Sequence, residues 1–269
     1  MDEKLKKKIL EENIKLHKIE SKTYRQIHAE IYNFYEQQRI TKDIDLIIDT
    51  IQKESPSVLD VGCGTGNILL KFLKRNAVVT GVDISNEMLD ELKKYVGSSA
   101  SLITADADDF IKIQLKNNKK YDIISFSSIL HHLPDYFDTV TNACNLVRGG
   151  GCLYIVHEPP LVWKEKQTTC MYVYRIWSFA DEKIYRWRLK MKGVKHPDIS
   201  CYEYADYHVW QGERGINQEQ IWRILKENGF KIVQSKKYIT RRNGIFALVD
   251  NLLKINPTND FSLIAQKLE

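Results

Sequence analysis

The stretch VLDVGCGTGN, from Val58 to Asn67, decides the fold. A short apolar run that contains one aspartate leads directly into glycines at positions 62, 64 and 66. Glycine adopts backbone angles that other residues avoid, and it lets a ligand approach the main chain. A glycine turn after a buried strand therefore indicates a ligand-binding site at the strand end. Its GxGxG spacing departs from the GxGxxG dinucleotide fingerprint, which disfavours a nicotinamide dehydrogenase.

Apolar and polar runs alternate on both sides of this stretch. Strands are expected at 58–61, 77–85, 101–107, 121–130 and 152–158, and helices at 68–75, 86–96 and 136–147, with Ser85 or Asn86 as an N-cap. Alternation of this kind predicts a parallel sheet covered on both faces. The pattern breaks over 161–213, and then predicts a helix at 217–230, a strand at 231–239, a helix at 244–255 and a strand at 261–268.

Composition describes an ordinary globular chain of 269 residues with a net charge of +5. No apolar run is long enough to span a bilayer, and the charged N-terminus has no signal-peptide core. The five cysteines are odd in number and include no CxxC pair. We therefore expect neither a disulfide framework nor a metal site, and a cytoplasmic location.

Five segments in order resemble the motifs of class I S-adenosylmethionine-dependent methyltransferases. These are VLDVGCGTG, VTGVDIS, ADADDF, YDIISFSSILHHLPD and LVRGGGCLYIVHEP, and the resemblance is strong over 55–160 and weak over 214–269. It implies an α/β fold in three layers, a doubly wound, Rossmann-like sheet of seven mostly parallel strands with an antiparallel last strand. It also implies S-adenosylmethionine as cofactor and S-adenosylhomocysteine as product.

The resemblance assigns a cofactor site to the ends of these strands. It comprises Asp60, Gly62, Cys63, Gly64, Gly66, Asp83, Ile84, Met88, Asp106, Ala107 and Ser127. Asp83 would accept both ribose hydroxyls, although an acidic residue there also suits a helix N-terminus. Asp106 would contact the adenine amino group, but two further aspartates follow it closely.

Four polar residues are candidates for catalysis. His131 and His132 follow the fourth strand, where the family places the reacting methyl group, and a histidine can accept the proton of an amine or hydroxyl. We prefer His131; the alternative is that one histidine packs inward and the other caps a helix. His157 and Glu158 end the fifth strand, where they either hold a substrate group or mark the exit of the strand into solvent.

The segment 161–213 has no clear periodicity and is rich in aromatic and basic residues. Placed after the fifth strand, it would form a lid that contacts the substrate through Trp163, Tyr172, Trp177, Arg186 and Tyr207. An ordinary helical subdomain with a solvated basic face is the alternative. The predicted organisation is a helical cap over 1–45, a core over 46–160 and 214–269, and this inserted lid.

The predicted reaction is in-line transfer of a methyl group to nitrogen or oxygen of a small molecule, such as an amino sugar nucleotide, a glycan precursor or a secondary metabolite. A modest charge and the absence of an NPPY motif favour a small molecule over nucleic acid. Two alternatives remain: an RNA or protein methyltransferase that docks through the basic segment, and a non-catalytic cofactor-binding regulator. Homodimer formation is left open, and the acceptor itself is not predicted.

Overall fold

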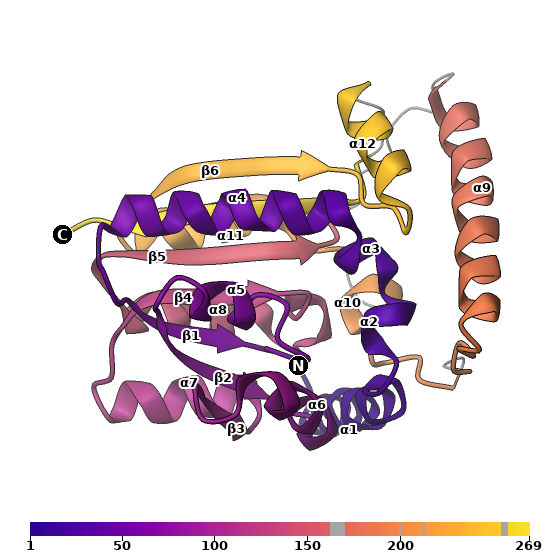
Figure 1. The fold of residues 1–269 in the computed structure, drawn as a ribbon. Helices are drawn as coiled ribbons and strands as arrows, with labels where there is room; N and C mark the ends of the chain where they lie inside the picture. The colour runs from indigo at the N-terminus through magenta and orange to yellow at the C-terminus, as the bar shows by residue number, and fades with distance from the viewer. Residues whose placement is uncertain (162–169, 199–200, 212–213, 254–257) are drawn as a thin grey trace.

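The computed structural model describes residues 1–161, 170–198, 201–211, 214–253 and 258–269, without the side chains of 170–175 and 210. Its centre is one sheet of seven strands in the order β3-β2-β1-β4-β5-β7-β6 (Figure 1). The strands are β1 (Ser57–Val61), β2 (Val78–Asp83), β3 (Ala100–Thr104), β4 (Tyr121–Ser127), β5 (Val147–Glu158), β6 (Phe230–Tyr238) and β7 (Asp260–Lys267). Strand β7 is the one strand that runs opposite to the other six, and it pairs antiparallel with both β5 and β6. The predicted fold class is therefore confirmed.

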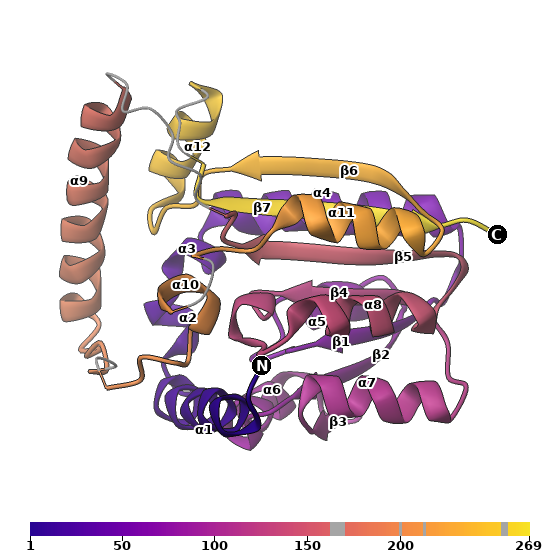
Figure 2. The same cartoon turned by 180° about the vertical axis from the view of Figure 1, so that it is seen from behind.

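Helices cover both faces of the sheet, which makes three layers. One face packs against α4 (Phe34–Ile51), α5 (Leu69–Leu73) and α6 (Asn86–Val96), which lie in front in Figure 1. The other packs against α7 (Ala107–Lys116), α8 (Tyr136–Leu146) and α11 (Gln218–Glu227), which lie in front in Figure 2.

Strand β1 shows how the sequence specifies these layers. Side chains alternate across a strand, so Val58 enters the core under α4 and α5, whereas Leu59 and Val61 enter the core under α8. A strand that is apolar on both faces must lie in the middle of the sheet. The strand order reverses between β1 and β4, so their carboxyl ends open the crevice where such folds bind ligands.

The remaining helices gather at the carboxyl ends of the parallel strands (Figure 1). They are α1 (Glu3–Glu20), α2 (Tyr24–Ile27), α3 (Ala29–Tyr32), α9 (Cys170–Met191), α10 (Tyr207–Trp210) and α12 (Gly244–Leu252), with a 3₁₀ turn η1 (Leu130–His132) after β4. Among the described residues, no helix has both the length and the apolar character needed to cross a membrane.

Three strand boundaries differ from the sequence prediction by three residues or more. The third strand ends at Thr104 rather than 107, because Asp106 accepts a hydrogen bond from the Asp109 N–H and caps α7, which the sequence analysis missed. The fourth strand ends at Ser127, since residues 130–132 form η1. The fifth begins at Val147, because the glycines at 149–151 continue the strand instead of forming a turn before it.

Candidate active site

A cavity lies at the carboxyl ends of β1, β2 and β4; we call it the first cavity. Eight of the predicted cofactor residues line it: Gly62, Gly64, Asp83, Ile84, Met88, Asp106, Ala107 and Ser127. Asp60 and Cys63 line a smaller cavity beside it, which Gly62 and Gly64 also border. Gly66 lies further back, where an added Cβ would come within 2.4 Å of Leu92, so it serves the packing of α6.

The glycine turn is held by main-chain hydrogen bonds that it donates to β2. The N–H groups of Gly62 and Cys63 both donate to the Val82 carbonyl, at 2.8 and 3.0 Å. Gly62 and Gly64 have φ angles of +68° and +49°, which glycine adopts without strain. A Cβ on Gly62 would lie 2.3 Å from the Ile129 side chain, whereas a Cβ on Gly64 would meet no heavy atom within 4 Å. The backbone at Gly64 therefore faces open space at the cavity wall.

Asp83 is held rigidly at the edge of the first cavity. Its Oδ2 accepts from the Gly64 N–H and its Oδ1 from the Ser85 N–H, both at 2.8 Å. Burial raises the pKa of Asp83 to about 6, against the opposing effect of these two amides. Each oxygen keeps a lone pair, so the carboxylate can accept a pair of hydroxyl hydrogens.

Asp60 has one oxygen without a partner. Its Oδ1 accepts from the Ser125 hydroxyl at 2.6 Å, while its Oδ2 is buried and makes no hydrogen bond to the described residues. Burial raises the pKa of Asp60 to about 7, against the effects of the Ser125 hydroxyl and the Leu69 amide. An orphaned carboxylate oxygen beside a cavity suits a ligand that brings an ammonium group.

A second cavity adjoins the first. Five of the seven histidines of the chain line it: His17, His28, His131, His132 and His157. Four carboxylate side chains also contribute, namely Glu20, Glu30, Asp206 and Asp260. The two cavities share His17, Tyr24, Ser128 and His132, so a group bound in one can reach a group bound in the other at this boundary.

His131 forms a dyad with the buried Glu158. The His131 Nδ1 lies 2.7 Å from Glu158 Oε2, and because a carboxylate only accepts, Nδ1 carries the proton and Nε2 keeps its lone pair. The other Glu158 oxygen accepts from the N–H groups of Ile129 and Leu130, both at 2.8 Å. Burial opposes protonation of His131, but the charge of Glu158 outweighs it and raises the pKa above its ordinary value.

His132 and His17 are kept neutral instead. Burial and the nearby His131 lower the pKa of His132, and burial with the nearby His132 lowers the pKa of His17 to about 3. The His132 Nδ1–H donates to the Ala205 carbonyl at 2.8 Å. His131, His132 and Asp206 also offer ligand atoms within 4.8 Å of one another, so they could hold a metal ion, which the sequence analysis did not predict.

His28 differs from the other histidines described above because a glutamate lies at each of its ring nitrogens. Its two ring nitrogens lie 3.3 Å from Glu20 and 3.1 Å from Glu30. Burial lowers the pKa of His28, but the hydrogen bonds and charges of these glutamates outweigh it and raise the pKa to about 10. His28 is therefore a fixed cation that neutralises the wall formed by α1 to α3, and it has no lone pair to offer an acceptor.

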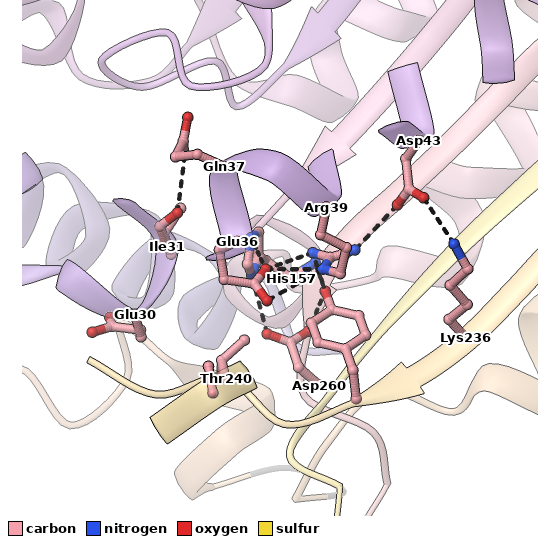
Figure 3. Close-up of polar contacts among 12 residues, drawn as sticks. Glu30, Ile31, Glu36, Gln37, Arg39, Asp43, His157, Lys236, Thr240 and Asp260 are labelled. Carbon is pink, nitrogen blue, oxygen red and sulfur yellow. Dashed lines mark hydrogen bonds and ion pairs between the residues drawn. The ribbon is translucent and has the colours of Figure 1, made fainter. Parts of the chain in front are cut away.

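His157 is buried in a polar network rather than free in the cavity (Figure 3). Its Nδ1 lies 3.1 Å from Asp260 Oδ2 and its Nε2 lies 3.3 Å from Glu36 Oε2. Arg39 binds both Glu36 oxygens and continues to Asp43. With a carboxylate at each ring nitrogen, His157 joins α4 to the ends of β5 and β7.

The predicted substrate residues of the lid that the structure describes do not meet in these cavities. Trp163 and the side chain of Tyr172 lie outside the described residues. Trp177 packs edge-on against Phe246, Arg186 pairs with Glu182 at 2.6 Å, and Tyr207 contacts the ring of His208. None of these three side chains lines the first or the second cavity as described.

The cap supplies cavity residues that sequence reasoning missed. His17 and Glu20 come from α1, and His28 and Glu30 from the short helices α2 and α3 or their junction. The available signal was the concentration of histidine and glutamate in an otherwise ordinary amphipathic segment. Tyr24, the first residue of α2, borders both cavities.

Comparison with curated proteins finds partial relatives. Residues of this chain are 36% identical to the ubiquinone biosynthesis O-methyltransferase of Coxiella burnetii over 97 residues, which is 36% of this chain and 41% of that protein. The protein of the same name from Vibrio vulnificus is 30% identical over 97 residues, with the same coverage. The chain thus spans about two fifths of the length of the curated relatives it matches.

Comparison with solved structures gives the fold. Magnesium protoporphyrin IX methyltransferase from Synechocystis PCC 6803 with bound SAM matches with a TM-score of 0.55 at 15% identity, over 95% of this chain and 97% of that one. The N-methyltransferase NodS from Bradyrhizobium japonicum WM9, in complex with S-adenosyl-L-homocysteine, matches with a TM-score of 0.52 at 14% identity, over 88% and 89%. At these identities the likeness concerns the fold alone.

A family model described as a methyltransferase domain matches residues 32–235, well over half of the chain. The match includes the glycine turn, Asp83, His131 and Glu158. The chain therefore belongs to the methyltransferase-domain family, and it has the Rossmann-like fold of S-adenosylmethionine-dependent methyltransferases.

Proposed function

We propose that this chain moves a methyl group from S-adenosylmethionine in the first cavity to nitrogen or oxygen of a small molecule in the second cavity. The observation that carries the proposal is the boundary between the cavities, where His17, Tyr24, Ser128 and His132 border both. Methyl transfer is a direct displacement, so donor and acceptor must meet in line within contact distance. Two adjoining cavities with a common wall satisfy that requirement.

The residues of the first cavity fit the cofactor. Asp83 would accept the ribose hydroxyls, and the orphaned Asp60 Oδ2 would accept from the methionine ammonium group. Gly64 would let the ligand lie against the backbone, since nothing else occupies that space. Asp106 and Ala107 border the cavity at its adenine end in this arrangement. When bound, the cofactor supplies a methyl group made electrophilic by its sulfonium charge.

His131 is the base in this proposal. Glu158 holds the imidazole in the tautomer whose Nε2 lone pair is free, and it stabilises the cation that forms when Nε2 takes a proton. The raised pKa of His131 makes it a better proton acceptor for an amine or hydroxyl than the neighbouring His132. Glu158 itself is a positioning residue, because both its oxygens are occupied by donors of the η1 region.

A small acceptor suits the way the cap contributes to the site. Side chains of α1 and α2 line both cavities together with the strand ends, and α3 adds Glu30 and Ile31 to the second, so the acceptor would bind between the cap and the edge of the sheet. The names of similar proteins include an O-methyltransferase and an N-methyltransferase, and this chain carries a base that serves either nucleophile. We therefore keep nitrogen and oxygen as alternatives.

The test compares His131→Ala with His132→Ala and with the exposed His196→Ala as matched control. Transfer of labelled methyl groups to a fractionated metabolite extract measures activity, and titration calorimetry measures affinity for S-adenosylmethionine. We expect His131→Ala to reduce turnover by ~10²–10⁴-fold at unchanged cofactor affinity. A loss below tenfold would refute the base, and labelling of total RNA or protein instead of metabolites would refute the small acceptor.

A further inference from the structure

One helix of the described structure turns a row of apolar side chains to solvent. In α9, Ile176, Phe179, Trp187 and Met191 are 71%, 63%, 61% and 70% exposed. At 100° per residue these four positions fall within an arc of about 120° on the helix surface. Exposed apolar residues are common singly, but a contiguous stripe that includes tryptophan and phenylalanine marks a binding surface.

The orientation of this stripe is fixed by the opposite side of α9. The buried Tyr185 donates its hydroxyl hydrogen to the Ile27 carbonyl at 2.8 Å. Asp181 accepts from the N–H groups of Arg242 and Asn243 at 2.9 and 2.8 Å. Both figures show α9 as the outermost element, beyond α2, α3 and α12 (Figures 1 and 2). The apolar stripe therefore faces away from the molecule and from the two cavities.

Positive charge surrounds the stripe. Residues 183–195 contain six lysines and arginines and no acidic residue. Lys183 and Lys190 fall on the same arc as the apolar side chains, and Lys183 lies 4.4 Å from the centre of the Phe179 ring. Long cationic side chains on an apolar face can bury their stems and keep their charge in a polar layer.

We propose that the outer face of α9 docks in the plane of an anionic lipid surface. Apolar side chains that include Trp and Phe, flanked by Lys and Arg, are the features of helices that lie in the headgroup region. The anionic headgroups supply the charge that this face lacks. The proposal goes beyond the methyl-transfer reaction and does not depend on it.

Two other occupants fit the face less well. A second copy of the chain would bring Lys183 and Lys190 against their own equivalents, with no acidic residue on this arc to pair with them. Nucleic acid would match the charge but not the aliphatic side chains of Ile176 and Met191, which neither stack on bases nor bind phosphate. An anionic lipid surface accommodates both the charge and the apolar side chains.

The experiment is co-sedimentation of the full chain with vesicles of phosphatidylcholine alone or mixed with phosphatidylglycerol. We expect binding to the mixed vesicles that weakens as salt rises. Two double variants should each weaken vesicle binding by at least ~30-fold: the apolar pair Phe179→Ser/Trp187→Ser and the charged pair Lys183→Glu/Lys190→Glu. Their matched controls change exposed residues away from α9 and should bind as the unmodified chain does. These controls are Val78→Ser/Ile113→Ser and Lys226→Glu/Lys231→Glu.

All substituted side chains are exposed, and thermal unfolding is the control that tests whether each variant folds. Binding of the unmodified chain to both kinds of vesicle alike, or to neither, would overturn the proposal. The proposal would also be overturned if the chain formed a dimer that Trp187→Ser dissociates. It would likewise be overturned if RNA bound through the lysines of α9 and competed fully with vesicles. Quenching of tryptophan fluorescence by brominated lipid gives an independent readout, and it should disappear with Trp187→Ser.

Discussion

A pair of glycines allows a sharp test of the first cavity. Gly64 and Gly97 have φ angles of +49° and +52°, and a Cβ built on either would meet no heavy atom within 4 Å. Replacing either by alanine brings no clash within the protein. The positive φ at Gly64 should cost alanine about 1–2 kcal/mol of stability. The cost should be larger at Gly97, whose ψ of −120° lies outside the left-handed helical region.

Only Gly64→Ala should lose ligand affinity. Gly64 borders both the first cavity and the smaller cavity beside Asp60, and its N–H holds Asp83 in place. A methyl group there would push the ligand away from the main chain and weaken its bonds to Asp83. Hydrogen bonds to a charged group contribute about 1.5–3 kcal/mol, so affinity should fall by ~10–100-fold or more. Gly97 lies at the far end of α6, where no such contact exists.

Titration calorimetry with S-adenosylmethionine and S-adenosylhomocysteine measures the affinities, and thermal unfolding measures stability. We expect Gly64→Ala to lose no more stability than Gly97→Ala, and we expect a loss of affinity in Gly64→Ala only. Should Gly64→Ala bind both ligands as tightly as Gly97→Ala, the glycine would serve the turn alone and the cofactor would lie elsewhere. Equal weakening of binding in both variants would instead mean that strain, not contact, controls affinity.

Three further outcomes test the site and its support. Asp83→Ala should weaken cofactor binding by ~10–100-fold in calorimetry. Because burial raises the pKa of Asp83 to about 6, the affinity of the unmodified chain should fall as the pH drops through that value. Asp83→Ala should lack this decrease and keep the one near pH 7 that protonation of Asp60 causes. Glu158→Gln should lower turnover by ~10²-fold or more at unchanged cofactor affinity, and should move the acid limb of the rate profile to lower pH because His131 loses its carboxylate. His157→Leu should cost about 3–5 kcal/mol in denaturant unfolding, since it leaves Glu36 and Asp260 buried beside an apolar side chain; a loss below 1 kcal/mol would contradict the role of this network.

The cofactor side of the site was predictable because its residues follow strand ends. The glycine turn and Asp83 each come directly after an apolar run, and parallel strands bring their carboxyl ends to one edge. Local sequence therefore specified both the element and the position of the side chain within it. The dyad was only half predictable: His131 and Glu158 were both noted, but their separation of 27 positions in the sequence concealed their contact.

The acceptor side could not be predicted in the same way. Its wall combines α1, the α2–α3 junction, η1, α10 and the ends of β5 and β7, and packing alone brings these together. Helix α9 was missed for a different reason. It carries apolar side chains on its inner face, such as Tyr185 and Leu189, and on its outer face, such as Ile176 and Trp187. A helix that is apolar on two sides shows no clear periodicity.

Residues 156–158, at the end of β5, help to position both the proposed base His131 and the wall of the second cavity. His157 has a φ of +57° and lies where the β5–β7 register shifts between Val156 and Glu158. This bulge sends the His157 ring toward Glu36 of α4 and Asp260 of β7, while the Glu158 carboxylate turns to η1. A strained residue is retained where its surroundings require it. The bulge at His157 thus links α4 to the end of β5, and the adjacent Glu158 positions His131, so a change at either position should disturb the other.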